Sequence, residues 1–365
     1  MSSTGAESVS ARLLQRVHAA ITAAGGWLPF DRCMAIVLYE PGLGYYSRDS
    51  RQFGLLPASG SDFVTAPELS PLFGRALAVQ VRQGLDAAGA GEVYEFGAGS
   101  GALAAQLLDT LGERIERYSI VDLSGALRAR QAATLSRWAH KLRWLDRWPE
   151  AMHGVVIGNE VLDAMPVQLL HWDGERWFER GVVAAAGALA WEDRATALRP
   201  PHAGPWVPGT VTEIHPQAEA FVRTLAQHLR RGLALFIDYG FPEAEYYHPQ
   251  RTGGTLMCHR GHLADTQPLA DVGEKDITAH VNFSAVALAA QDAGLDVLGY
   301  TSQAHLLINC GLPALLEQAD LRQRAHAQKL ITEHEMGELF KALALGRGLV
   351  IDPVGFAAGD RMHTL

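Results

Sequence analysis

The feature that most constrains the fold is a glycine-rich turn, Glu95-Phe-Gly-Ala-Gly-Ser-Gly101, between two regular segments. The apolar residues 93–96 predict a strand, and the pattern of residues 102–111 predicts a helix. Glycine at alternate positions permits positive φ and lets a ligand approach the backbone. The first turn of the following helix offers unpaired N–H groups to that ligand. The sequence therefore predicts an α/β sheet with a ligand site at the end of one strand.

Strands and helices continue to alternate after this turn. Further strands are predicted at residues 118–121, 142–145, 154–157 and 233–237. Such alternation implies crossover connections and a parallel sheet. We expect strand 154–157 to lie beside the strand that leads into the glycine turn.

The predicted organisation has an N-terminal helical and loop region, residues 1–88, and a core, residues 89–365. A proline at position 71 after Ser70 predicts the start of a helix that runs to about Asp86. Two stretches interrupt the core and are expected to be insertions on the substrate side. Residues at about 169–215 begin with a predicted antiparallel hairpin or meander, whereas residues 241–284 show no clear periodicity.

Composition restricts the class of protein. The chain has 365 residues, 48% of them hydrophobic and 19% charged, which is ordinary for a globular protein. A net charge of −9 disfavours a nucleic-acid partner. Three widely spaced cysteines argue for a reducing compartment, and no apolar run is long enough to span a bilayer. We therefore expect a cytoplasmic protein without membrane insertion. One cysteine and two histidines at 258–262 are too few for a zinc site, so no metal is expected.

The spacing of the glycines distinguishes two possible cofactors. A dinucleotide fingerprint is G-x-G-x-x-G, whereas this turn is G-x-G-x-G and follows the acidic Glu95. A carboxylate there would repel a pyrophosphate, but it suits the ammonium group of S-adenosylmethionine. Asp122 ends the next strand, 25 residues after Gly97, where its carboxylate can accept hydrogen bonds from ribose hydroxyls. The glycines alone would also fit a turn that merely connects strand and helix. The predicted cofactor-binding residues are Glu95, Gly97, Gly99, Gly101, Asp122 and Asn159.

The sequence resembles the MidA-like methyltransferases, a bacterial and mitochondrial family. The residues that carry the resemblance are 38–46, 60–70, 95–101, 159–166, 237–240, 254–256 and 276–283. The resemblance implies a Rossmann-like class I methyltransferase core that uses S-adenosylmethionine. Mitochondrial members are complex I assembly factors that dimethylate an arginine of a partner subunit, so the resemblance implies a protein substrate such as a respiratory-complex subunit. Asp122 departs from the glutamate expected in the family, although either acid can bind a ribose.

Three residues are candidates for catalysis: Glu160, Asp163 and His280. Glu160 follows a predicted strand at the carboxyl edge of the sheet, where open α/β sheets bind ligands. If a helical turn follows, Glu160 and Asp163 share a face, although both could simply be first-turn acids favoured by the helix dipole. His280 could pair with an acid or with the acceptor. Glu213 is expected to cap a helix, and Asp238 either reaches the same edge or anchors a loop.

Three functions are compatible with these patterns. The first is a protein methyltransferase with arginine as the acceptor favoured by the resemblance. The second is a non-catalytic S-adenosylmethionine-binding assembly factor that keeps the same fold. The third is a nicotinamide-dependent oxidoreductase, against which the glycine spacing and Glu95 argue. The sequence gives no indication of the oligomeric state.

Overall fold

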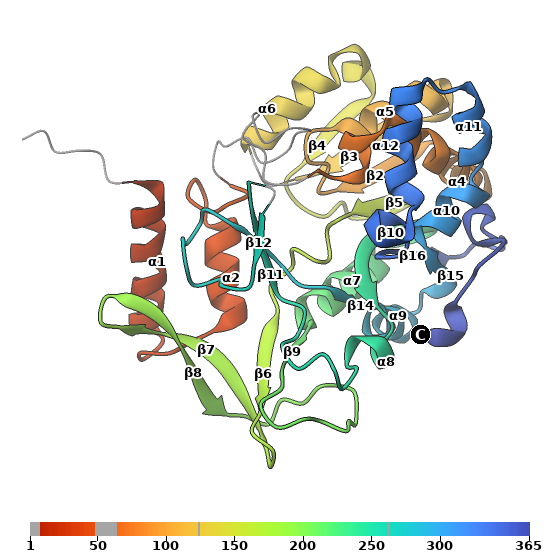
Figure 1. Cartoon of the computed structure of the whole chain (residues 1–365). Coiled ribbons are helices and arrows are strands. Elements are labelled where there is room, and N and C mark those ends of the chain that lie inside the picture. Colours follow the sequence, from red (N-terminus) through yellow and green to blue (C-terminus); the bar gives the residue numbers. More distant parts are fainter. Residues whose placement is uncertain (1–7, 48–63, 123–124, 262) are drawn as a thin grey trace, which may run out of the picture.

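The computed structural model describes residues 8–47, 64–122, 125–261 and 263–365 (Figure 1). The described residues exclude residues 48–63 and His262. The excluded residues contain part of segment 60–70, which carries the family resemblance. None of the helices in the described ranges combines the length and the apolar character that a membrane span requires. The three cysteines are buried free thiols.

An eight-stranded sheet forms the centre of the molecule, in the order β15-β16-β10-β5-β2-β3-β4, with β14 beside β10. The strands are β2 (Glu92–Phe96), β3 (Arg117–Val121), β4 (Leu142–Leu145), β5 (Met152–Asn159), β10 (Leu229–Phe241), β14 (Val281–Asn282), β15 (Asp296–Ser302) and β16 (Phe340–Arg347). All five predicted strands are present. The parallel pairing of β2 with β5 confirms that the strand at 154–157 adjoins the glycine-turn strand.

The sheet is mixed, which corrects the expectation of a parallel sheet. Strands β4, β3, β2, β5 and β10 run parallel, but β16 pairs antiparallel with both β10 and β15. The helices α10 (Gln303–Asn309), α11 (Leu312–Gln318) and α12 (Leu321–Ile331) lie between β15 and β16 in the chain. An apolar strand pattern does not encode direction, and an antiparallel edge on a parallel sheet is common.

Helices cover both faces of this sheet. They are α4 (Pro71–Ala88), α5 (Ala102–Leu111), α6 (Gly125–Thr134), α7 (Pro216–His228) and α9 (Phe283–Asp292). Helix α4 begins as predicted, since the Ser70 side chain accepts a hydrogen bond from the N–H of Leu72 and Pro71 occupies the first turn. Its end at Gly89, which has a φ of 64°, fits the residue best suited to a left-handed cap.

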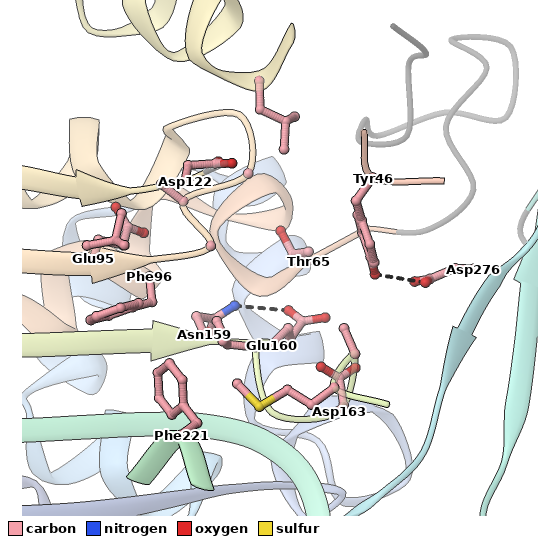
Figure 2. Close-up of a pocket in the computed structure, with 18 of the residues that line it drawn as sticks. Tyr46, Thr65, Glu95, Phe96, Asp122, Asn159, Glu160, Asp163, Phe221 and Asp276 are labelled. Carbon is pink, nitrogen blue, oxygen red and sulfur yellow. Dashed lines mark hydrogen bonds between the residues drawn. The ribbon is translucent and has the colours of Figure 1, made fainter. Parts of the chain in front are cut away.

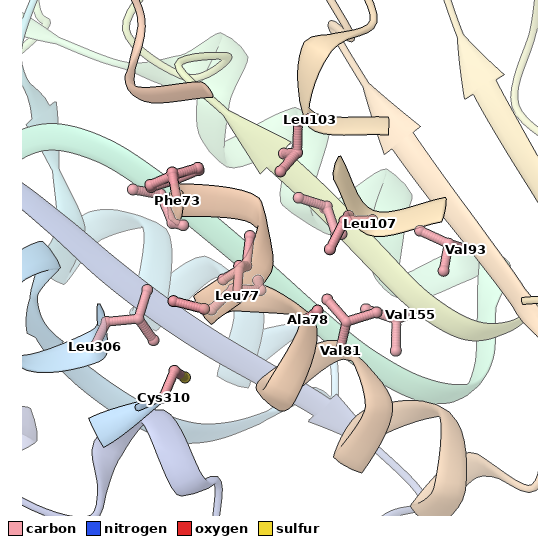
Figure 3. Packing of buried hydrophobic residues seen from close by; sticks show 14 of the residues in the cluster. Phe73, Leu77, Ala78, Val81, Val93, Leu103, Leu107, Val155, Leu306 and Cys310 are labelled. Atoms are coloured by element: carbon pink, nitrogen blue, oxygen red, sulfur yellow. The ribbon is translucent and has the colours of Figure 1, made fainter. Parts of the chain in front are cut away.

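Helices α4 and α5 pack on one face of the sheet through fully buried apolar side chains (Figure 3). Phe73 and Leu77 of α4 and Leu107 of α5 belong to the same core cluster as Val93 of β2 and Val155 of β5. Each such side chain contributes about 1.5–3 kcal/mol when it is fully buried. This packing holds the strand, the glycine turn and helix α5 in a fixed geometry.

A second sheet is formed by β1 (Leu28–Pro29), β6 (Gln168–Trp172), β7 (Trp177–Ala185), β8 (Ala188–Ala195) and β9 (Val211–Ile214). All of its pairings are antiparallel, as the pattern after residue 169 predicts. The helices α1 (Val9–Ala23) and α2 (Phe30–Tyr39) share a hydrophobic core with this sheet. The N-terminal residues and the stretch at 169–215 are therefore packed together.

The stretch 241–284 contains regular structure that the sequence did not predict. It includes α8 (Glu243–Tyr246) and a three-stranded antiparallel sheet of β11 (Met257–Arg260), β12 (Leu263–Asp265) and β13 (Asp276–Thr278). Strands of three or four residues are too short to show a period of two above the surrounding glycines and turns. A short helix, α3 (Ala66–Leu69), precedes α4.

Candidate functional site

A cavity of about 1160 Å³ lies at the carboxyl ends of β2, β3 and β5 (Figure 2). This is the edge at which open α/β sheets bind ligands. Eight of the nine predicted site residues line it: Glu95, Gly97, Gly99, Asp122, Asn159, Glu160, Asp163 and His280. Gly101 does not line the cavity but precedes α5 with a φ of 86°. Glu95 and Asp122 lie toward one end of the cavity, and Tyr46 and Asp276 lie toward the other.

The glycine turn has the positive φ angles that its sequence predicts. Gly97 has a φ of 64° and Gly99 a φ of 53°, a region that side-chain-bearing residues rarely adopt. The side chain of Gln131 in α6 holds this turn in place. Its Nε2 donates to the carbonyl oxygen of Gly99 at 3.1 Å and to Oδ2 of Asp122 at 2.8 Å. Gln131 thus fixes two predicted cofactor-binding residues together, although no sequence signal marked it.

Glu95 is almost completely buried at the end of β2, with 2% of its surface exposed. The hydroxyl of Tyr118 donates to its Oε2 at 2.8 Å. Burial raises the pKa of Glu95 to about 7, an effect that the Tyr118 bond opposes and the charge of Asp122 reinforces. A cationic ligand would favour the ionised form of this carboxyl group. The arrangement is therefore suited to an ammonium or sulfonium group.

Aromatic rings form one wall of the same end. Trp148 and Phe221 line the cavity, and their ring centres lie 5.0 Å apart. Phe96 contacts both rings, at 4.6 Å from Trp148 and 5.2 Å from Phe221. Such faces can cover a flat heterocycle. Phe221 comes from α7, far from the glycine turn in sequence, and no local pattern predicted its position.

Glu160 occupies a strained position immediately after β5. It has a φ of 55°, although it is not glycine, and strain of this kind tends to persist at functional sites. The side chain of Asn159 donates to Oε1 of Glu160 at 3.0 Å (Figure 2). The pKa of Glu160 is raised to about 8, chiefly by burial and next by the charge of Asp163. The backbone N–H of Ala66 also bonds to this carboxyl group.

The helical turn expected after β5 is absent, so Glu160 and Asp163 do not share a helical face. The backbone turns instead over Asp238, whose Oδ2 accepts hydrogen bonds from the N–H groups of Val161 at 3.1 Å and Leu162 at 2.9 Å. A side chain of β10 therefore satisfies the donors that a helix would have paired internally. Of the two alternatives for Asp238, the geometry supports loop anchoring. Asp163 still lines the cavity, because the loop brings it there.

The far end of the cavity combines carboxyl groups and aromatic rings. The hydroxyl of Tyr46 donates to Oδ1 of Asp276 at 2.8 Å, and the ring of Tyr39 stacks on Tyr46 with 5.6 Å between centres. His280 lies 5.2 Å from Tyr239, centre to centre. Burial lowers the pKa of His280 to about 4, and nearby Arg and Lys charges add to the effect. The imidazole is therefore neutral at physiological pH.

Glu213 does not cap a helix, which corrects the prediction. It is fully buried, and its carboxyl group accepts hydrogen bonds from the N–H groups of Thr255 at 2.9 Å and Leu256 at 3.0 Å, and from the Tyr246 hydroxyl at 3.0 Å. The contacts of Glu213 with residues 254–256 therefore replace the helix cap that its position before Pro216 predicted. Thr255 Oγ1 in turn accepts from the N–H of His280 at 3.1 Å. Within the described ranges, no three His, Cys, Asp or Glu side chains are grouped to hold a metal ion.

The sheet, the acidic glycine turn and the cavity at its end define a class I, Rossmann-like methyltransferase fold. Residues 72–301 match the family described as "Putative S-adenosyl-L-methionine-dependent methyltransferase". The chain belongs to this family, and S-adenosylmethionine is its cofactor. The family resemblance seen in the sequence is thereby confirmed, and the nicotinamide alternative is set aside.

One solved structure and two named relatives agree with this assignment. A protein from Burkholderia thailandensis, bound to S-adenosyl-homocysteine, is 51% identical, with a TM-score of 0.94 and coverage of 98% of this chain and 97% of that one. The mitochondrial protein arginine methyltransferase NDUFAF7 of Homo sapiens is 27% identical over 86% of this chain and 78% of that protein. The homologue from Caenorhabditis elegans is 26% identical over 86% of this chain and 81% of that protein.

Proposed function

We propose that this methyltransferase acts on a protein and transfers the methyl group to an arginine side chain. The observation that carries the proposal is the acidic acceptor end of the cavity, where Glu160, Asp163 and Asp276 line the wall. Carboxylates bind a guanidinium through paired, charge-assisted hydrogen bonds. The names of the NDUFAF7 relatives point to the same acceptor.

The opposite end fits S-adenosylmethionine. Glu95 is the proposed partner of the ammonium group, and Asp122 of the ribose hydroxyls, while Gly97 and Gly99 allow close approach to the backbone. Asn159 is proposed to help, because its Oδ1 is buried and accepts no hydrogen bond from the described residues. When bound, the cofactor supplies an electrophilic methyl group on a sulfonium.

Between the two ends, Glu160 is proposed to hold the acceptor. It follows β5, the strand next to the glycine-turn strand, and its side chain lies between the groups that face the cofactor and those at the far end (Figure 2). Methyl transfer is an in-line displacement in which alignment of the reacting atoms supplies much of the rate. A carboxylate at this point can orient a guanidinium and tolerate a neighbouring sulfonium. His280, neutral and at the edge of the same end, is proposed as a contact for the acceptor.

Methyl-labelled S-adenosylmethionine and a lysate from cells that lack this protein test the proposal. The labelled protein is isolated and its modified residue is identified by mass spectrometry. We expect label on arginine, and we expect none with Gly99→Val, the variant designed to lose the cofactor. A respiratory-complex subunit, implied by the family resemblance, is the first purified acceptor to try. Label on another residue type would contradict the arginine proposal. Cofactor binding without any transfer would instead support the non-catalytic assembly factor.

A further inference from the structure

Asp163 and Asp238 form a buried pair of carboxyl groups beneath the acceptor end of the cavity. Asp163 is 4% exposed and lines the cavity, whereas Asp238 is fully buried, does not line the cavity, and lies three residues before the end of β10. The two side chains are hydrogen-bonded to each other. The backbone fixes the pair from both sides, through the Asp238 bonds to residues 161 and 162 and through the N–H of Ala279, which donates to the Asp163 carbonyl oxygen at 3.0 Å.

A hydrogen bond between two carboxyl groups requires a shared proton. Oδ1 of Asp163 and Oδ1 of Asp238 are both buried, and neither accepts an N–H or O–H from any residue in the described ranges. Two ionised carboxylates are acceptors only and cannot bond to each other, so one proton must lie between them. The pair therefore carries a single negative charge between its first and its second titration step.

The surroundings assign that proton to Asp238. Asp238 is the deeper of the two groups, and burial together with the charge of Asp163 raises its pKa well above the usual value. Burial raises the pKa of Asp163 as well, but Asp163 lines the cavity, and hydrogen bonding from the side chain of Tyr239 and from the backbone opposes that rise. The other titratable groups whose charges act within this cluster are Glu160, Asp276, Tyr39 and Tyr46.

We propose that Asp163 takes the proton that the acceptor nitrogen loses, while Asp238 holds the shared proton behind it. The inference rests on the proposed function, because it requires an acceptor nitrogen that carries a proton. In this step a bond forms between that nitrogen and the methyl carbon, and the bond from carbon to sulfur breaks. Its electron pair stays on sulfur, which becomes a neutral thioether. The N–H proton passes to the Asp163 carboxylate, so the pair changes from one negative charge to none.

Two reciprocal substitutions test the assignment. In Asp238→Asn, the amide Nδ2 can donate to Asp163 and the amide oxygen can accept from Val161 and Leu162, so the variant imitates a protonated aspartate. Its turnover should stay within about fivefold of wild type. Asp163→Asn keeps the shape but cannot accept a proton, and turnover should fall by about 100-fold or more. Both variants should retain the affinity of the wild type for S-adenosyl-homocysteine, which calorimetry measures.

Infrared difference spectroscopy provides a readout that does not depend on the acceptor. At neutral pH, the infrared spectrum of Asp238→Asn should lack the signal of one protonated carboxyl group that the wild type shows. Loss of an ionised carboxylate signal in Asp238→Asn would overturn the assignment. So would higher turnover in Asp163→Asn than in Asp238→Asn, turnover near wild type in both variants, or loss of turnover in both. Turnover is measured on whichever protein takes up label. Label on a residue other than arginine therefore contradicts the proposed function. The turnover of the two variants and the infrared signal test the proposed roles of Asp163 and Asp238 separately.

Discussion

The hydroxyl of Tyr46 donates a 2.8 Å hydrogen bond to Asp276, although 230 residues separate them in the chain. Tyr46 lies beyond α2 and Asp276 begins β13, so the bond joins the N-terminal segment to the small three-stranded sheet across the far end of the cavity (Figure 2). A tyrosine bonded to a carboxylate at this point fixes the orientation of an acidic group that faces the proposed acceptor. The two segments are thereby coupled as one wall.

Tyr46→Phe should weaken acceptor binding without changing cofactor binding. The substitution removes one hydrogen bond to a carboxylate, worth about 1.5–3 kcal/mol, so KM for the acceptor should rise about 10-fold or more. The matched variant is Tyr118→Phe, which removes the bond to Glu95 at the other end and should weaken S-adenosylmethionine instead. Equal effects of both variants on both ligands would contradict the division of the cavity into two ends.

Gly99→Val should abolish binding of S-adenosylmethionine. Gly99 has a φ of 53°, which a β-branched residue strongly resists, and its added side chain would stand in the cavity wall. Gly89→Val is the control, because Gly89 has a φ of 64° at the end of α4 and no atom lies within 4 Å of the position of its added Cβ. Calorimetry should detect binding to the control alone. Normal affinity in Gly99→Val would remove the turn from the cofactor site.

Glu213→Ala should destabilise the fold. It leaves the N–H groups of Thr255 and Leu256 without their buried acceptor and removes one of the partners of the Tyr246 hydroxyl, and each buried group left without a partner costs about 1–3 kcal/mol. The control is Glu243→Ala, on the more exposed helix α8. A denaturant midpoint that drops only for Glu213→Ala is the expected result. If both midpoints stay near wild type, the network around Thr255 is not a structural anchor.

Stability should fall as pH rises because buried carboxyl groups hold protons in the folded state. The pKa of Glu160 is about 8 against a reference of 4.5, so between these values the folded chain retains a proton that the unfolded chain has released. The free energy of unfolding therefore decreases with pH across this window, by at most about 1.4 kcal/mol per pH unit for one group. Glu160→Gln should flatten this dependence. An unchanged slope between pH 5 and 8 would contradict a protonated Glu160.

The sequence pattern predicted those site residues that lie at the ends of strands or in the turns that follow them. Glu95 and Gly97 lie on one strand and its turn, and Glu160 ends the adjacent strand, so alternation of strands and helices was enough to bring them together. Gln131 could not be found this way, because a glutamine within a helix resembles a surface residue. Its role depends on how α6 lies against the turn.

Contacts between distant segments also account for the wrong predictions. Glu213 stands just before a helix with Pro216 in its first turn, so local rules favoured a cap, but the glycine at 254 lets the backbone of residues 255 and 256 reach its carboxyl group. The direction of β16 and the three short strands in 241–284 likewise depend on pairing across the fold. A pattern of apolar residues carries no information about either.

Paired measurements on Glu160→Gln test the central claim most directly, namely that one end of the cavity holds the cofactor while Glu160 positions the acceptor. The variant keeps the shape of the side chain but cannot carry the negative charge that a bound cationic acceptor would favour on Glu160 by lowering its raised pKa. Loss of a charge-assisted hydrogen bond costs about 1.5–3 kcal/mol, so the rate of methyl transfer should fall about 10- to 150-fold. The Kd for S-adenosylmethionine should change much less, because Glu95 and Asp122 are its proposed anchors. A rate near wild type, or a loss of cofactor affinity as large as the loss of rate, would contradict the account.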